Sequence, residues 1–201
     1  MRWLLIIVAA IAPSQAARDA RPRVVLDNAR VRVYRATAGP LTGVDHAPAV
    51  VVSLDDRPGA RAGSAVWVAD AAAASRTANV RGSIVIVQPR GDAVAPPRSA
   101  GSTPGDAPFT GMSFEPIFEN DRVSAIRARM EVGAREGFHT HGSDTIVVHL
   151  SGGEIEDTSD GKTVVNRWTR GDVEFEGLGT SHSARNVGAA VDVVLVVLKP
   201  Q

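Results

Sequence analysis

The sequence predicts an all-β protein, and three observations favour this fold class. Glycine and proline are frequent, at 19 and 12 of 201 residues, and they divide the chain into short segments. Short valine-rich runs lie between these turn residues, which is typical of strands. No long segment repeats apolar residues at the helical period. Short strands at this spacing indicate a barrel or a sandwich, and an apolar share of 44% is enough for a sizeable core.

Candidate strands occur in both halves of the chain. We expect strands at residues 31–36, 49–54, 65–69 and 84–88, and then at 123–131, 138–141, 145–150, 163–168, 173–176, 182–186 and 191–198. Asp160-Gly161 predicts a hairpin with a tight two-residue turn. The segment Leu26–Val31 (LDNARV) resembles Phe118–Val123 (FENDRV), and each precedes a predicted strand. This similarity predicts an internal duplication.

The first residues have the pattern of a signal peptide. Arg2 supplies a positive charge, residues 3–12 are apolar, and the small residues Ser14 and Ala16 follow. We therefore expect residues 1–16 to be removed on export, and the mature protein to be periplasmic or secreted. This apolar run is about half the length needed to span a bilayer, and no second apolar segment could span one, so we expect no membrane contact after cleavage.

Two parts with a linker between them are expected in the mature chain. Residues 90–116 form a segment rich in Gly, Pro and Ala, which has little to bury and is typical of a connection. The expected parts are residues 22–89 and residues 117–199.

Composition excludes several classes of function. The 22 basic and 22 acidic residues balance, and no basic run favours binding to nucleic acid. The chain has no cysteine, which excludes disulfides, thiolate nucleophiles and cysteine zinc sites. Ser181 precedes His182 without the motif of a serine hydrolase. The acidic cluster of Glu154, Glu156, Asp157 and Asp160 is interpreted as a solvated hairpin rather than a calcium site.

Three of the five histidines predict a metal site. His139 and His141 are two residues apart on a predicted strand, so both side chains point to one face with Cα atoms about 6.6 Å apart. His182 begins a later predicted strand. Imidazole nitrogens are common ligands of transition metals, and three of them can surround one ion.

The spacing of these histidines is that of two known motifs. Five residues separate Gly133 from His139-Thr140-His141, and Gly152 follows at a fixed distance; in the second motif Gly171, Gly179, His182 and Asn186 keep their expected spacing. Over residues 117–199 the chain resembles the cupin superfamily, except that Thr145 replaces a glutamate and Gly177 replaces a proline. The resemblance implies a double-stranded β-helix, or jelly-roll, barrel with His139, His141 and His182 as metal ligands. It also implies a bicupin whose first half, residues 22–89, is degenerate.

The missing glutamate leaves three interpretations open. The three histidines can hold a divalent ion (Fe, Mn, Zn or Ni) with water completing its shell. Asp144 can replace the carboxylate, although it needs a bulge to face the same side as its neighbours. In the third interpretation there is no metal, and the histidines line a pocket for an organic ligand. A neutral ligand set leaves the ion's charge uncompensated, which favours anionic ligands.

Two classes of function are compatible with these residues. The first is a small-molecule metalloenzyme of the dioxygenase, isomerase or decarboxylase type, for which no catalytic base is identified. The second is a non-catalytic bicupin that binds a small molecule or a metal. The resemblance also implies a homodimer. His149 is expected to be buried or to face the pocket, too far along its strand to share the ion, and His46 has no histidine partner nearby.

Overall fold

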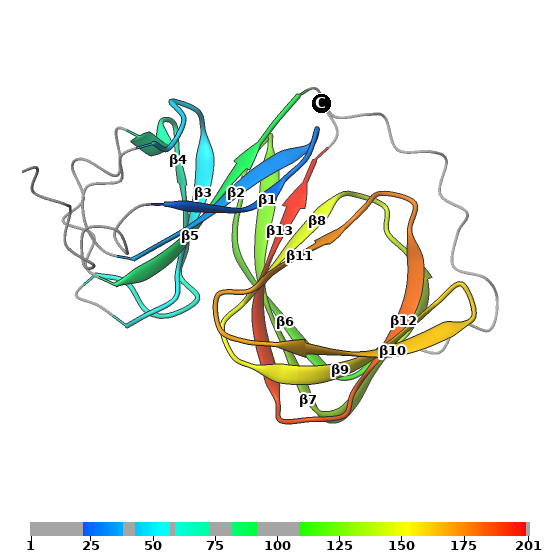
Figure 1. Cartoon of the computed structure of the whole chain (residues 1–201). Coiled ribbons are helices and arrows are strands. Elements are labelled where there is room, and N and C mark those ends of the chain that lie inside the picture. Colours follow the sequence, from blue (N-terminus) through cyan, green and yellow to red (C-terminus); the bar gives the residue numbers. More distant parts are fainter. Residues whose placement is uncertain (1–21, 38–42, 57–58, 73–81, 92–108, 200–201) are drawn as a thin grey trace, which may run out of the picture.

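The computed structural model describes residues 22–37, 43–56, 59–72, 82–91 and 109–199. Within these ranges the protein is all-β, as the sequence predicts, and its strands form two antiparallel sheets (Figure 1). The predicted signal peptide at residues 1–16 lies outside the described residues. No helix in the described part of the chain is long and apolar enough to cross a membrane.

The first sheet contains five strands in the order β1-β2-β5-β3-β4. Their bounds are β1 Arg23–Asp27, β2 Val31–Thr37, β3 Ala49–Ser53, β4 Ala65–Val68 and β5 Ser83–Pro89. Strand β5 lies at the centre, and five successive residues of it are buried. Four of the five, residues 84–87, form a continuous apolar run, which is typical of a strand that is covered on both faces.

The second sheet contains eight strands and closes into the jelly-roll barrel visible in Figure 1. Its order is β10-β9-β12-β7-β13-β8-β11, with β6 also paired to β7. The bounds are β6 Thr110–Glu119, β7 Val123–Thr140, β8 Thr145–His149, β9 Gly153–Ser159, β10 Lys162–Trp168, β11 Val173–Glu176, β12 Ser181–Asn186 and β13 Val191–Leu198.

Strand β7 is one long strand where the sequence predicts two, at 123–131 and 138–141. Residues 123–130 of β7 pair with β13, and residues 135–140 pair with β12. Between these two stretches Gly133 has a φ of 75°, which favours glycine and allows the strand to bend. This bend carries one continuous strand from one side of the barrel to the other. Strand β6 begins at Thr110, inside the expected linker of residues 90–116.

The two sheets repeat one topology. The order β1-β2-β5-β3-β4 of the first matches β6-β7-β13-β8-β11 of the second. The duplicated motif occupies equivalent turns: the side-chain oxygen of Asn28 accepts hydrogen bonds from the backbone N–H groups of residues 30 and 31, and that of Asn120 does so from residues 122 and 123. Strands β9, β10 and β12 have no counterpart among the described residues of the first half.

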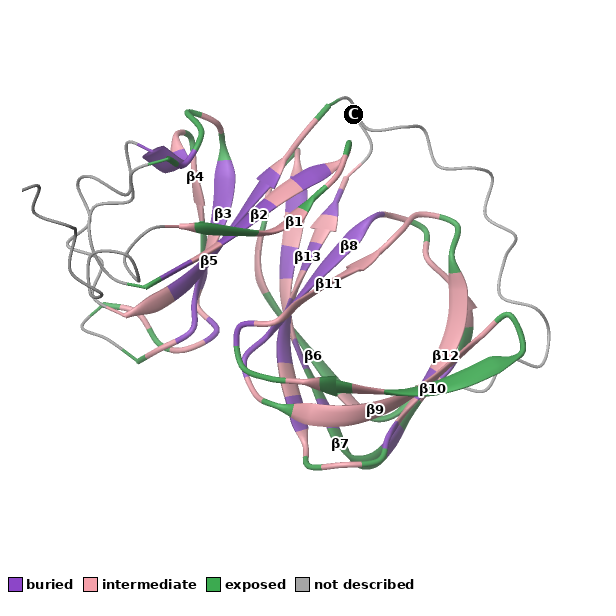
Figure 2. Ribbon diagram, viewed as in Figure 1, coloured by how far each residue is buried: buried purple, intermediate pink, exposed green. Residues whose placement is uncertain are grey.

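A shared apolar core joins the two sheets. Buried residues concentrate where β2, β3 and β5 face β8 and β13 (Figure 2). The core is mainly valine, and both sheets contribute to it, with Val33, Val52, Val85 and Val87 from the first and Ile146, Val148, Val194 and Val196 from the second.

Equivalent glycines lie on either side of this interface. Gly63, in the first half, approaches Leu150 and the guanidinium of Arg127, and a Cβ at this position would lie 2.7 Å from the Leu150 side chain. Gly171, in the second half, has the guanidinium of Arg35 equally close. A larger residue at either glycine would therefore displace a side chain of the opposite sheet.

We expect Ile146→Ala to destabilise both sheets together. The Ile146 side chain is fully buried in the shared core, and loss of such a side chain costs about 2–5 kcal/mol of unfolding free energy. Urea unfolding should show one cooperative transition, moved to lower urea, whether followed by Trp67 in the first sheet or by Trp168 in the barrel. Val164→Ala, at an exposed position of β10, is the control and should change stability by less than about 0.5 kcal/mol. Separate transitions for the two tryptophans would show that the sheets fold independently.

Candidate metal centre and the barrel cavity

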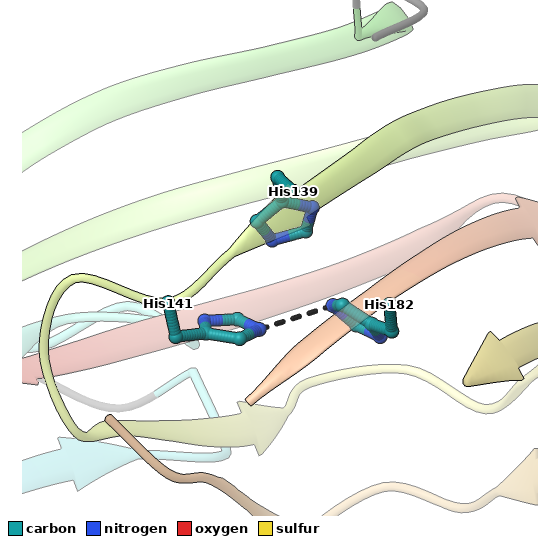
Figure 3. Close-up of side chains that lie close together, drawn as sticks. All are labelled: His139, His141 and His182. Carbon is teal, nitrogen blue, oxygen red and sulfur yellow. Dashed lines mark hydrogen bonds between the residues drawn. The ribbon is translucent and has the colours of Figure 1, made fainter. Parts of the chain in front are cut away.

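The three predicted histidines lie close together inside the barrel (Figure 3). His139 is the residue before the last of β7, and His141 directly follows the end of that strand. His182 on β12 pairs directly with His139. One ring nitrogen of each residue lies within 4.8 Å of those of the other two. The Nε2 atoms of His141 and His182 are 3.1 Å apart, the contact that is dashed in Figure 3.

Hydrogen bonds orient two of the rings. The Nδ1–H of His139 donates to the carbonyl oxygen of Gly137 at 2.9 Å, and the Nδ1–H of His182 donates to the carboxylate of Asp157 at 2.6 Å. Carbonyl and carboxylate oxygens only accept, so the proton of each neutral ring is on Nδ1 and its Nε2 carries a free lone pair. Both lone pairs are therefore available for a ligand at the centre of the group.

The spacing of the nitrogens fits a divalent transition ion. Two nitrogens bound at about 2.1 Å and at a right angle would lie about 3.0 Å apart, and a tetrahedral angle would place them at about 3.4 Å. The 3.1 Å between the Nε2 atoms of His141 and His182 falls between these values. This contact is a hydrogen bond when His141 carries its proton on Nε2. A cation bound to both atoms would replace that proton.

Thr145, which stands where the glutamate is missing, and Asp144, the residue considered as its replacement, are both buried. Thr145 lies on β8 and is 8% exposed. Asp144 accepts a hydrogen bond from Arg30 Nε at 2.7 Å with one carboxylate oxygen and from the backbone N–H of Leu178 at 2.9 Å with the other. Because both oxygens are engaged, Asp144 serves to connect the first sheet to the barrel, and we do not include it among the ligands.

Four carboxyl groups that sequence reasoning did not assign to the site line the same cavity as His182: Glu136, Asp157, Glu174 and Glu176. A carboxylate oxygen of Glu136 lies 3.7 Å from His139 Nε2, and one of Glu176 lies 3.7 Å from His141 Nδ1. Glu174 and Glu176 occupy alternate positions of a predicted strand, so the sequence alone could have predicted that both side chains lie on the same face.

Asp157 corrects the interpretation of the acidic cluster as a solvated hairpin. It points into the barrel and binds His182. Glu154 and Glu156 do pair with arginines across the strands, at Arg167 and Arg185. Strand pairing therefore places Asp157 in the cavity and its neighbours Glu154 and Glu156 beside arginines. The alternation of side chains along β9 alone did not reveal which residue each acid contacts.

Burial shifts several pKa values in the cavity. It lowers the pKa of His141 to about 4, and the neighbouring His182 and His139 act in the same direction. Burial raises the pKa of Glu174 to about 7, and it raises that of Glu176 to about 8 with a contribution from the charge of Glu174. Without a cation, the imidazole of His141 is thus neutral at pH 7 and the carboxyl of Glu176 is largely protonated. A bound cation would favour ionised carboxyl groups around it.

The remaining walls of the cavity are mostly apolar. They come from β6, β7, β8, β9, β12 and β13, and include Met112, Phe114, Ala128, Met130, Val147, Ile155, Ala184, Val191, Val193 and Leu195. At the side of the histidines, Phe109 packs edge-on against His139 with ring centroids 5.2 Å apart. The cavity therefore offers an apolar surface for a small organic molecule beside a cluster of polar groups. His46, by contrast, is exposed and bonds Asp70 at 2.9 Å.

Comparisons with known proteins find solved structures that are similar to somewhat less than half of the chain. No protein-family model matches the sequence, and no curated protein matches it significantly. Among solved structures, a cupin domain from Bordetella pertussis Tohama I is 24% identical over 44% of this chain and 94% of its own, at a TM-score of 0.42. KdgF from a Halomonas species is 18% identical over 47% of this chain and 88% of its own, at a TM-score of 0.39. The DMSP lyase DddQ from Ruegeria pomeroyi is 22% identical at a TM-score of 0.38, over 44% of this chain and 47% of its own.

Proposed function

We propose that this chain is a cupin-type metalloprotein that binds one divalent transition ion through the Nε2 atoms of His139, His141 and His182. The ion would lie beside a cavity that takes a small organic molecule. The observation that carries the proposal is the convergence of three imidazole nitrogens, two of which have their lone pairs fixed toward the centre by hydrogen bonds on the opposite ring atom. Partly buried imidazoles held in this way are typical of metal ligands.

Iron, manganese, nickel and zinc all accept a set of imidazole ligands, so the identity of the ion stays open. Three protein ligands leave coordination positions free for a substrate, where the ion would act as an electrophile. Around it, Glu136 and Glu176 are placed to exchange a proton with a bound molecule, since each has a carboxylate oxygen 3.7 Å from a ligand histidine. These groups support turnover of the dioxygenase, isomerase or decarboxylase type as the finer proposal.

A binding protein without turnover is the second candidate. The observation that favours it is Thr145, a buried hydroxyl in place of the carboxylate ligand that the cupin motif predicts. The four carboxyl groups of the cavity also change the charge expected for the metal site. They can compensate a divalent cation, so the site does not require the anionic ligand that a neutral histidine set alone favours.

The first half of the chain is proposed to be a degenerate copy of the barrel that now acts as its structural partner. The equal strand order and the equivalent turns at Asn28 and Asn120 support the duplication. Export to the periplasm or the medium, and pairing of two chains, remain further proposals that rest on the sequence.

Elemental analysis tests the metal proposal directly. The full chain is purified from its native compartment without chelators, and we expect about one transition ion per chain. If the purified protein contains no metal, it is titrated with Co²⁺. We then expect Co²⁺ to bind at a single site and to show visible absorption bands typical of nitrogen and oxygen ligands. Failure to retain any transition ion from either source would overturn the proposal.

A further inference from the structure

His149 is a polar side chain that the metal site does not use. It is 1% exposed, lines the barrel cavity, and neither ring nitrogen has a hydrogen-bond partner in the structure. A buried polar group without a partner costs free energy, typically about 1–3 kcal/mol, and such a group in a native protein calls for an explanation. Among the buried side chains of the described residues, only the nitrogens of His149 are in this position.

The surroundings of His149 fix its ring in place. The indole of Trp168 stacks on it, with ring centroids 4.6 Å apart and an angle of 17° between the planes. The nearest acid is Glu174, with a carboxylate oxygen 4.0 Å from His149 Nε2. Asn166 lines the same part of the cavity wall on β10, two residues before Trp168. The ring is thus stacked on Trp168, and the polar edge that carries Nε2 faces Glu174, which also lines the cavity.

This polar edge lies away from the histidine cluster within one continuous cavity. Along β11, Glu176 contacts His141 and Glu174 contacts His149. The two acids are alternate residues of one strand with Cα atoms about 6.6 Å apart, so the two contacts lie at successive inward positions along β11. The walls between the ends are largely apolar, with Val147 and Val193 among them.

We propose that His149, with Glu174 beside it, forms a second polar subsite of the cavity that binds the uncharged hydroxyl group of a small alcohol or phenol. Such a ligand would place its apolar skeleton along the valine-lined wall, and its other end near the histidine cluster. The subsite extends the function proposed above to the ligand, but its own binding step does not require the metal.

The chemistry of the subsite selects a hydroxyl group. Burial lowers the pKa of His149 to about 4, so its ring is neutral at pH 7 and offers one donor and one acceptor. A hydroxyl group supplies one donor and one acceptor in return. A ligand carboxylate would instead lie beside the carboxyl group of Glu174, and two carboxyl groups in one buried setting do not readily ionise together.

Phenol and toluene are matched probes for this subsite, because they differ only by a hydroxyl in place of a methyl group. The full chain is stripped of metal and labelled with ¹⁵N-histidine, and each probe is titrated by NMR. Phenol should shift the ring nitrogens of His149 and leave those of the exposed His46 unchanged. Failure of the metal proposal would not affect this result, since neither probe nor protein carries a metal.

The variant His149→Phe keeps an aromatic ring against Trp168 but removes both nitrogens. The ratio of phenol affinity to toluene affinity should fall about five- to tenfold in this variant, and stay unchanged in the control His46→Phe. An unchanged ratio in His149→Phe, or no shift of His149 in the unmodified protein on adding phenol, would overturn the proposal. If His149→Phe does not fold, the proposal is tested by the chemical shifts of the His149 ring nitrogens in the unmodified protein.

Discussion

Replacing His139 with alanine is expected to weaken metal binding by about 100-fold or more. A structural zinc site with four ligands is worth about 10–16 kcal/mol, so that loss of one ligand removes about 3 kcal/mol, or a factor of about 100. His139 supplies one of the three converging nitrogens, and its ring is held by Gly137 rather than by another ligand. Competition with a chelator of known affinity, using Zn²⁺ or Co²⁺, measures the change.

His46→Ala is the matched control for this prediction. It removes an imidazole that is 65% exposed and bonded to Asp70, outside the cluster. Its metal affinity should equal that of the unmodified chain. The metal-free His139→Ala protein should also keep its fold, because the substitution removes a side chain that is 23% exposed and a single hydrogen bond, the one to Gly137. Equal metal affinity in the two variants would contradict the assignment of His139 as a ligand.

Asp157→Asn is expected to lower metal affinity by about 10–100-fold without removing a ligand. The Asp157 carboxylate accepts the Nδ1–H of His182 at 2.6 Å, which fixes the ring and increases the basicity of Nε2. Partners of this kind around metal-bound histidines typically contribute a factor of this size. Asparagine keeps the shape and one acceptor oxygen but removes the negative charge, so the effect should appear in the affinity rather than in the number of ions bound.

The same hairpin offers a control for the charge itself. Asp160→Asn makes the identical substitution at an exposed turn residue with a φ of 49°, a conformation that asparagine tolerates. It should leave metal affinity unchanged. If the two asparagine variants weakened binding equally, the effect of Asp157 would be one of general charge, and its contact with His182 would have no special role.

Local sequence determined the parts of the fold that depend on periodicity and turns. The strands around Asp160-Gly161 form the predicted hairpin, in which Ser159 pairs with Lys162 across a turn whose two central residues both have positive φ. The alternation of side chains along a strand sufficed to predict that His139 and His141 point the same way. Motif spacing then added His182, which lies opposite His139 in the ladder between β12 and β7.

Only the tertiary structure decided which groups surround those histidines. Strand β12 pairs with β7 on one side and with β9 on the other, and this double pairing brings Asp157 to His182 across 25 residues of sequence. The sequence likewise gave no sign that Trp168 stacks on His149, or that Asp144 binds Arg30 of the other sheet.

The physical reason is that a strand's own residues fix which side chains share a face, whereas its neighbours and register are fixed by burial of the whole sheet. The spacing of His139 and His141 is a local property of the chain and can therefore be predicted from the sequence. The carboxyl groups, the unpartnered imidazole of His149 and the shared core depend on contacts between distant segments, and these exist only once the barrel has closed.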